Sequence, residues 1–132
     1  LAGTDALTGL LNRRSFLASA ASVLEAGVPV AALMLDLDHF KAINDRYGHP
    51  VGDAVLREVA ATLAGGLRRD DLLARFGGEE FAVLLPHTGA QTALAVAERL
   101  RSAVATQRSG PGARPAGSPV TRSTCGPQRI NQ

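Results

Sequence analysis

The sequence has little cysteine and no long hydrophobic run, and each of these absences excludes a kind of protein. Cys125 is the only cysteine among 132 residues, so no disulfide can form within the chain. No apolar run approaches the roughly 18 residues that a membrane-spanning helix needs, and no signal-peptide pattern opens the sequence. We therefore expect a cytoplasmic protein with no membrane segment in these residues. Because the sequence begins at Leu1 rather than methionine, we expect it to be part of a longer protein.

The formal net charge of +2 is unevenly distributed, which argues against a nucleic-acid partner. Residues 1–107 contain 10 lysines and arginines against 12 aspartates and glutamates. Residues 108–132 contain four arginines and no acid. The basic character therefore belongs to the last segment, and we expect no binding of nucleic acid.

Hydrophobic periodicity in residues 1–107 predicts an α+β fold. The apolar run 28–36 is typical of a strand buried on both faces, and the segments 71–76 and 81–86 predict two strands joined by a Gly-Gly turn. Apolar residues at helical spacing predict four helices. These span 12–26, 39–47, 52–63 and 89–107, with Asn12, Asp38 and Thr88 as caps and with Gly27 and Gly48 ending the first two.

The composition changes after residue 107. Residues 108–132 hold four prolines, four glycines and three serines, with no period of 2 or 3.6. Such a segment cannot bury enough apolar surface to order itself. We therefore expect one domain over residues 1–107 and a disordered tail over residues 108–132.

The segment "LMLDLDHFKAIND" contains the first candidate site. Asp36 lies where a buried strand ends, and a carboxylate there is costly unless a positive group satisfies it. Mg²⁺ would do so with substrate phosphates, and the helix start at 39–41 adds N–H donors that suit phosphates. The alternative is that Asp36 and Asp38 only end a strand and cap a helix. An EF-hand is excluded, because Lys41 and Tyr47 stand where that loop needs glycine and glutamate.

Two polar residues bracket the turn "NDRYGHPVGD" between the second and third helices. Asn44 and Asp53 lie on either side of it. A guanine edge offers N–H donors that a carboxylate accepts, and acceptors that an amide can meet. The pair predicts a guanine site, and the same residues also fit a solvated turn.

The segment "RFGGEEF" places two glycines and two glutamates at the tip of the predicted hairpin. Gly77 and Gly78 suit a tight turn and let a bulky ligand approach the backbone. Glu79 then projects where it can join Asp36 on a metal. A solvated turn is the alternative here, and a surface loop is the alternative for the charged step "RRDD" at 68–71.

Taken together, these segments resemble the GGDEF family, the diguanylate cyclases. "DALTGLLNRR", "DLDHFKAIND", "GHPVGDAVL", the Arg68-x-x-Asp71 step and "RFGGEEF" occur in this order over about residues 4–107. The resemblance implies a ferredoxin-like, palm-type antiparallel sheet with helices packed on it. It also implies condensation of two GTP molecules to cyclic di-GMP across a homodimer, with an upstream sensor domain.

The resemblance further implies a role for each matching residue. Asp36, the Leu37 carbonyl and Glu79 are similar to the ligands of two Mg²⁺ ions per active site, which Mn²⁺ can replace. Glu80 is the second acid of the motif and joins Asp36 and Glu79 as a catalytic residue. The other matches are Asn44 and Asp53 for guanine, the backbone of His39, Phe40 and Lys41 with the Lys41 side chain for phosphates, Gly77 and Gly78 for clearance of the nucleotide, and Arg68 and Asp71 for inhibition by the product.

The resemblance cannot be followed in the sequence after Gln107. Domains of this family continue with a strand carrying a Val-x-x-Ser-x-Gly-like pattern, then a helix and a strand with basic residues. We expect this strand-helix-strand part to be missing, through truncation or a frameshift. The alternative function is therefore an inactive GGDEF remnant that binds GTP or cyclic di-GMP. A nucleotide-sugar transferase using Asp36 and Asp38 is a more distant alternative, because it leaves the GGEEF tip unexplained.

Overall fold

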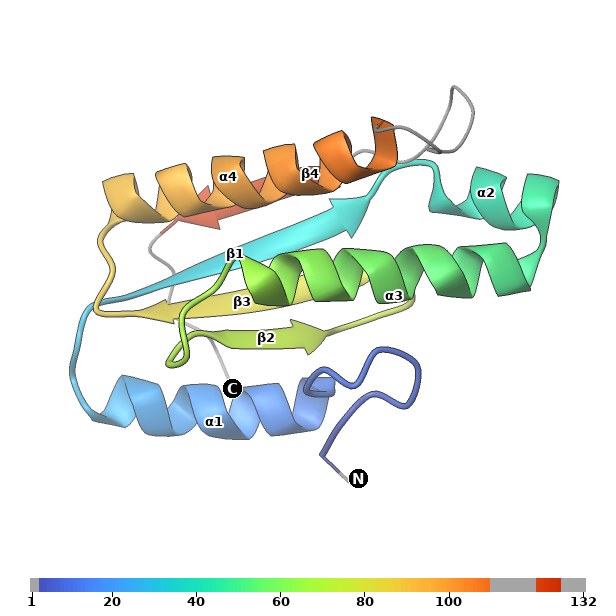
Figure 1. The fold of residues 1–132 in the computed structure, drawn as a ribbon. Helices are drawn as coiled ribbons and strands as arrows, with labels where there is room; N and C mark the ends of the chain where they lie inside the picture. The colour runs from blue at the N-terminus through green and yellow to red at the C-terminus, as the bar shows by residue number, and fades with distance from the viewer. Residues whose placement is uncertain (1–2, 110–120, 127–132) are drawn as a thin grey trace.

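The fold is a four-stranded antiparallel sheet with helices on both faces, which confirms the α+β class (Figure 1). The computed structural model describes residues 3–109 and 121–126. Its elements in chain order are α1 (Arg13–Glu25), β1 (Val30–Leu37), α2 (Phe40–Tyr47), α3 (His49–Gly65), β2 (Leu72–Arg75), β3 (Glu80–Pro86), α4 (Ala90–Ser109) and β4 (Thr121–Gly126). The strands lie in the order β2-β3-β1-β4, and each neighbouring pair is antiparallel.

Different helices cover the two faces of the sheet. α1 packs on one face, where Phe16 and Ala20 join Leu84 of β3 in a small apolar cluster. α3 and α4 cover the other face, and α2 packs against α3 near the end of β1 (Figure 1). Within residues 3–109 and 121–126, no helix has both the length and the apolar character that crossing a membrane requires.

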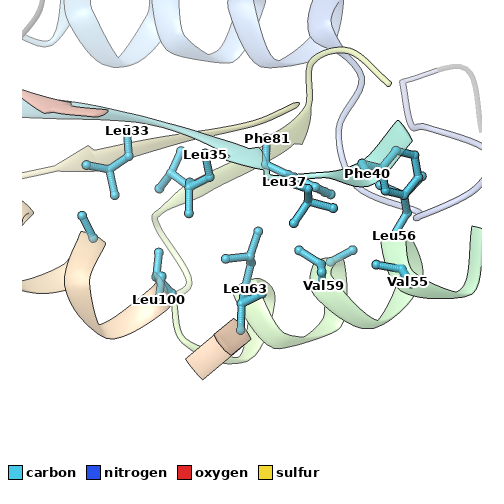
Figure 2. Packing of buried hydrophobic residues seen from close by; sticks show 14 of the residues in the cluster. Leu33, Leu35, Leu37, Phe40, Val55, Leu56, Val59, Leu63, Phe81 and Leu100 are labelled. Atoms are coloured by element: carbon cyan, nitrogen blue, oxygen red, sulfur yellow. The ribbon is translucent and has the colours of Figure 1, made fainter. Parts of the chain in front are cut away.

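The larger core lies between the sheet and the layer of α2, α3 and α4. Leu33, Leu35 and Leu37 alternate along β1 and point toward the helices, where Val59 and Leu63 of α3 meet them (Figure 2). Burying one leucine contributes about 1.5–3 kcal/mol. This packing therefore fixes β1 and, with it, the polar residues at its end.

The prediction that the first strand is buried on both faces is wrong. One face of β1 is buried, whereas Met34 on the opposite face is 36% exposed. The strand buried on both faces is β3, whose residues from Phe81 to Pro86 are all buried. The reason is position, because β3 lies between α1 on one face and the larger core on the other.

Some predicted helix ends are confirmed. The amide of Ser15 donates to Oδ1 of Asn12 at 2.9 Å, so Asn12 caps α1. Gly27 follows α1 with a φ of 73°, and Gly48 follows α2 with a φ of 89°. Both glycines adopt the left-handed region that other residues avoid, so they end their helices as expected.

Other predicted helix starts are wrong. His39, with a φ of 60°, takes the N-cap position of α2 in place of Asp38, because the chain turns sharply there. α3 begins at His49, three residues before the predicted start, with proline in its first turn. α4 begins at Ala90, and the hydroxyl of Thr88 donates to the Pro86 carbonyl at 2.9 Å rather than capping the helix.

The expectation of a disordered tail is wrong for part of its length. α4 continues through Ser109, and residues 121–126 form β4. β4 pairs antiparallel with β1, which is therefore not an edge strand. The physical reason is the row of N–H and C=O groups along β1, which a neighbouring strand satisfies. Residues 110–120 and 127–132 of the predicted tail lie outside the described residues.

Candidate active site

Acidic residues from distant parts of the chain meet at one end of the sheet. Asp36 lies near the end of β1, and Glu79 lies at the tip of the β2–β3 hairpin. The Leu37 amide donates to the Glu79 carbonyl at 3.2 Å, and Asp36 is the register partner of Glu80. Strand pairing therefore places Asp36, Glu79 and Glu80 beside one another, and we call these three residues the acid group.

The members of the acid group repel one another. Burial raises the pKa of Glu79, and the negative charges of Asp36 and Glu80 raise this pKa further. Oδ1 of Asp36 is buried and has no hydrogen-bond partner among the described residues. A buried carboxylate oxygen without a partner is costly, so this arrangement favours a cation between Asp36 and Glu79.

These oxygens fit a divalent metal ion that also binds the substrate. Within the described residues, no three His, Cys, Asp or Glu side chains are grouped to hold a metal by themselves. Mg²⁺ in proteins commonly takes one or two carboxylates and completes its shell with substrate phosphates and water. Asp36 and Glu79 would supply these one or two carboxylates, and the Leu37 carbonyl remains a predicted third protein ligand.

The two glycines of the tip differ in their surroundings. A Cβ on Gly77 would lie 2.8 Å from Oε1 of Glu80, whereas a Cβ on Gly78 would meet no atom within 4 Å. Both lie outside the left-handed region, unlike Gly9, Gly27 and Gly48, whose φ is positive. Gly77 thus leaves room for the Glu80 side chain, and the space beside Gly78 is open to a ligand.

Arg75 holds the tip, and this role was not predicted from the sequence. Nε and Nη2 of Arg75 donate to the Gly78 carbonyl at 3.2 and 2.9 Å, while Nη1 lies 3.1 and 3.2 Å from the carboxylate oxygens of Asp5. Burial acts to raise the pKa of Asp5, but hydrogen bonds from Thr8 and Arg75 and the charge of Arg75 outweigh it, and the pKa is lowered. The only signal in the sequence is the presence of both charges in the segments "DALTGLLNRR" and "RFGGEEF".

The predicted guanine-binding residues lie on either side of the α2–α3 junction. Oδ1 of Asn44 is buried and has no hydrogen-bond partner among the described residues. Gly52 of α3 approaches it so closely that a Cβ there would lie 1.8 Å from this oxygen. Asp53 is the next residue of α3 and is partly buried. The junction therefore holds a buried amide oxygen on α2, without a partner among the described residues, and a partly buried carboxylate on α3.

The start of α2 lies between these two places. His39 precedes the helix, so the amides of Phe40 and Lys41 belong to its first turn, where backbone N–H groups have no acceptor within the helix. Nζ of Lys41 is 3.4 Å from the Asp45 carboxylate, and the Lys41 side chain is 90% exposed. Such a surface pair is weak, so Lys41 is accessible to a phosphate.

Arg68 and Asp71 lie at the opposite end of β3. The Asp71 carboxylate accepts from the Arg68 amide at 2.7 Å and from its Nη2 at 3.2 Å. The same Nη2 donates to the Pro86 carbonyl and the Thr88 hydroxyl, both at 3.0 Å. At roughly 3.3 Å per residue, β3 separates this group from Glu80 by about 20 Å. The predicted inhibition residues therefore form a separate group. We call Arg68, Asp71, Pro86 and Thr88 the arginine cluster.

Comparison with protein families gives one match, which covers most of the chain. The family described as "Diguanylate cyclase, GGDEF domain" matches residues 2–123. The match continues past Gln107, after which no resemblance could be followed in the sequence, and includes the first three residues of β4. Val120-x-x-Ser123 indeed fits part of the expected pattern, with Gly126 one position late.

Curated relatives are similar to this chain over about three quarters of its length. The response regulator PleD of Caulobacter vibrioides is 50% identical over 105 residues, which are 76% of this chain and 23% of that protein. Diguanylate cyclase VdcA of Vibrio cholerae is 46% identical over 101 residues, which are 76% of this chain and 30% of that protein. The chain thus spans about a quarter of the length of these relatives.

Solved structures share the fold. Diguanylate cyclase SiaD of Pseudomonas aeruginosa, in complex with its activator SiaC, superposes with a TM-score of 0.81 at 39% identity, over 98% of this chain and 51% of that chain. The GGDEF domain of DgcB from Caulobacter crescentus, in complex with c-di-GMP, gives 0.80 at 32% identity, over 95% and 77% of the two chains. The arrangement of sheet and helices is therefore common to this chain and to both proteins.

Proposed function

Because this chain belongs to the GGDEF domain family, we propose that it is a diguanylate cyclase domain that condenses two GTP molecules to cyclic di-GMP in bacterial second-messenger signalling. The observation that carries this proposal is the acid group. Asp36 and Glu79 repel each other, and one buried oxygen of Asp36 has no partner among the described residues. Such a site suits a metal-bound triphosphate.

The proposed reaction is a phosphoryl transfer. The 3′-hydroxyl of each GTP attacks the α-phosphate of the other, so that two phosphodiester bonds form, two pyrophosphates leave and the two hydroxyl protons pass to solvent. Asp36, Glu79 and the Leu37 carbonyl would hold two Mg²⁺ ions, which Mn²⁺ can replace. When bound, the metal neutralises phosphate charge and favours the attacking alkoxide. Glu80, the register partner of Asp36, adds negative charge that favours the cations.

The remaining contacts orient the substrate. Asn44 and Asp53 would accept the N–H groups of guanine, and the amides of His39, Phe40 and Lys41 would donate to the phosphates. The buried oxygen of Asn44 supports this assignment, because it lacks a partner within the described part of the chain. The open space beside Gly78 would admit the nucleotide.

The proposed reaction requires two domains, because each one holds a single GTP. We therefore propose a homodimer as the catalytic unit, regulated by an upstream sensor domain in the cytoplasm. Cyclic di-GMP is the proposed product.

The arginine cluster is the proposed site of inhibition by the product. The Arg68 side chain is 62% exposed although its Nη2 is held by Asp71, so the guanidinium is both fixed and accessible. A fixed guanidinium suits a phosphate or the acceptor edge of a guanine. Adding cyclic di-GMP to an Arg68→Ala variant should then produce less inhibition than in the parent, and equal inhibition would contradict this site.

The proposed function is tested by incubating the protein with Mg²⁺ and GTP and detecting products by mass spectrometry. We expect cyclic di-GMP and pyrophosphate from GTP, and no cyclic dinucleotide from ATP. Omitting the metal should abolish the product. Failure to form cyclic di-GMP at protein concentrations where a dimer is present would overturn the proposal and favour the inactive remnant.

A further inference from the structure

The N-terminal segment forms a hook that fixes one carboxylate. We call residues 3–12 the hook, because the Asn12 amide donates to the Gly3 carbonyl at 3.1 Å and brings its ends together. Within it, Oδ2 of Asp5 accepts from the Thr8 amide at 2.9 Å and from the Thr8 hydroxyl at 2.7 Å. The Asp5 side chain is therefore oriented by its own segment.

The Asp5 carboxylate faces Arg75, the last residue of β2. Nη1 of Arg75 lies 3.1 and 3.2 Å from its two oxygens. The two side chains are only 19% and 21% exposed, so water screens the pair less than it screens a surface pair. The Arg75 amide also donates to the Leu11 carbonyl at 3.0 Å, which ties the hook to β2 a second time.

The other edge of the same guanidinium reaches the hairpin tip. Nε and Nη2 of Arg75 both donate to the Gly78 carbonyl, and Gly78 directly precedes Glu79. Gly78 has no side chain and no neighbour within 4 Å of its Cβ position, so packing does little to hold it. The bonds from Arg75 therefore supply the restraint that side-chain packing does not.

We propose that Asp5 is a positioning residue for the reaction: by orienting Arg75 it fixes the Gly78 carbonyl, and thereby the Glu79 carboxylate opposite Asp36. Asp5 itself touches no reacting atom. The role of Glu79 in this inference rests on the proposed function. The linkage from the hook to the tip is a property of the chain and can be tested separately.

The first test compares Asp5→Asn with the parent protein by hydrogen exchange and mass spectrometry. Asparagine keeps the shape of the side chain and the acceptor for Thr8, but it loses the charge that holds Arg75. Exchange of amides in residues 76–81 should become roughly tenfold faster, as expected for losing a charge-assisted hydrogen bond. Residues 55–63 of α3 should keep their rates. Unchanged exchange at the tip, or equal acceleration in both segments, would overturn the proposal.

The second test measures binding of Mn²⁺ in the presence of GTP by electron paramagnetic resonance. Asp5→Asn should weaken Mn²⁺ binding about tenfold, because Glu79 is less well placed. Binding of GTP without metal should be unchanged, because Asn44 and Asp53 lie on other elements. Parent-like affinity for Mn²⁺ in the variant would overturn the positioning role. If the parent itself fails to bind Mn²⁺ with GTP, the proposed function is wrong, and hydrogen exchange still decides the linkage.

Two further variants make the tests specific. Arg75→Lys keeps the positive charge, but a single ammonium cannot reach Asp5 and Gly78 with the geometry of a guanidinium. It should behave like Asp5→Asn, and it decides the question if that variant does not fold. Parent-like exchange and Mn²⁺ affinity in Arg75→Lys would show that charge alone suffices and would overturn the proposal. Glu98→Gln removes the acid of a more exposed ion pair within α4 and should leave the tip unchanged.

Discussion

The two ends of β3 carry opposite electrostatic arrangements. In the acid group, charges of one sign lie together, and Oδ1 of Asp36 has no partner among the described residues. In the arginine cluster, the guanidinium of Arg68 meets Asp71, Pro86 and Thr88. The first arrangement costs the folded chain free energy, whereas the second is satisfied within the chain. The difference indicates that the acid group carries an electrostatic cost which a bound cation would relieve, whereas the arginine cluster supports the fold before any ligand binds.

The largest effect is expected from Glu79→Gln. It removes a charge from the acid group but keeps the size of the side chain. We expect turnover of GTP with Mg²⁺ to fall by at least about 100-fold, because a proposed metal ligand is lost. Glu25→Gln, at the exposed end of α1, is the matched control. Near-normal turnover in Glu79→Gln would remove this residue from the proposed metal site.

Gly52→Ala should have the next largest effect. The added Cβ would lie 1.8 Å from Oδ1 of Asn44, so this amide must move. A site built for hydrogen bonds loses discrimination when a partner is displaced, and we expect affinity for GTP, measured calorimetrically, to fall roughly 10- to 100-fold. Gly65→Ala is the control, since a Cβ there meets no atom within 4 Å. Equal losses in both variants would mean that the effect comes from the helix and not from Asn44.

Arg68→Ala tests the arginine cluster, whose charges are paired within the chain. It leaves the Pro86 carbonyl and the Asp71 carboxylate with one donor fewer each. We expect the free energy of unfolding to fall by about 1–2 kcal/mol, because the hydrogen bonds are charge-assisted but the side chain is more than half exposed. Denaturant melts of Arg68→Ala and of Arg69→Ala, which is exposed, measure the difference. Equal stability of the two variants would show that the arginine cluster does not support the fold.

The smallest expected effect is on pH dependence. The pKa of Glu79 is raised above its ordinary value of 4.5, so the folded chain binds this proton more tightly than the unfolded chain. The resulting stabilisation is fully present below pH 4.5 and is lost as pH rises through the folded pKa. Without metal, Glu79→Gln should therefore melt roughly 1–2 °C higher than the parent at neutral pH, and this gain should vanish in acid. A melting point below that of the parent at neutral pH would show that Glu79 is not strained by its neighbours.

Short-range sequence patterns predicted much of the fold, because helix caps and helix ends depend on residues that are close in the sequence. The cap at Asn12 and the glycine at 27 are short-range features, and the structure confirms both. The proximity of Asp36 and Glu79 could also be predicted, because the end of a strand lies beside the tip of a hairpin when the two pair in one sheet. Burial on both faces was assigned to the wrong strand, because an apolar run does not say which strand lies in the middle of the sheet.

Contacts between distant segments could not be predicted from spacing. Nothing in the segments around Asp5 and Arg75 says that they meet, since their ion pair depends on where the hook lies against β2. β4 was missed for a related reason. Its sequence "TRSTCG" has no alternation of apolar and polar residues, and its order comes from pairing with β1. Val120 and Ser123 carried the only sequence signal for it.

The pairing of β4 with β1 has a consequence for the order in which the chain folds. During synthesis, Asp36 leaves the ribosome long before its register partner in β4, Arg122. Short-range units such as the α2–α3 pair and the β2–β3 hairpin form first, because closing a small loop loses less entropy than closing a large one. We therefore expect β1 to remain with one side open to solvent, or to a chaperone, until β4 has been made. The sheet that carries the acid group is then completed only when residues 121–126 emerge and pair with β1.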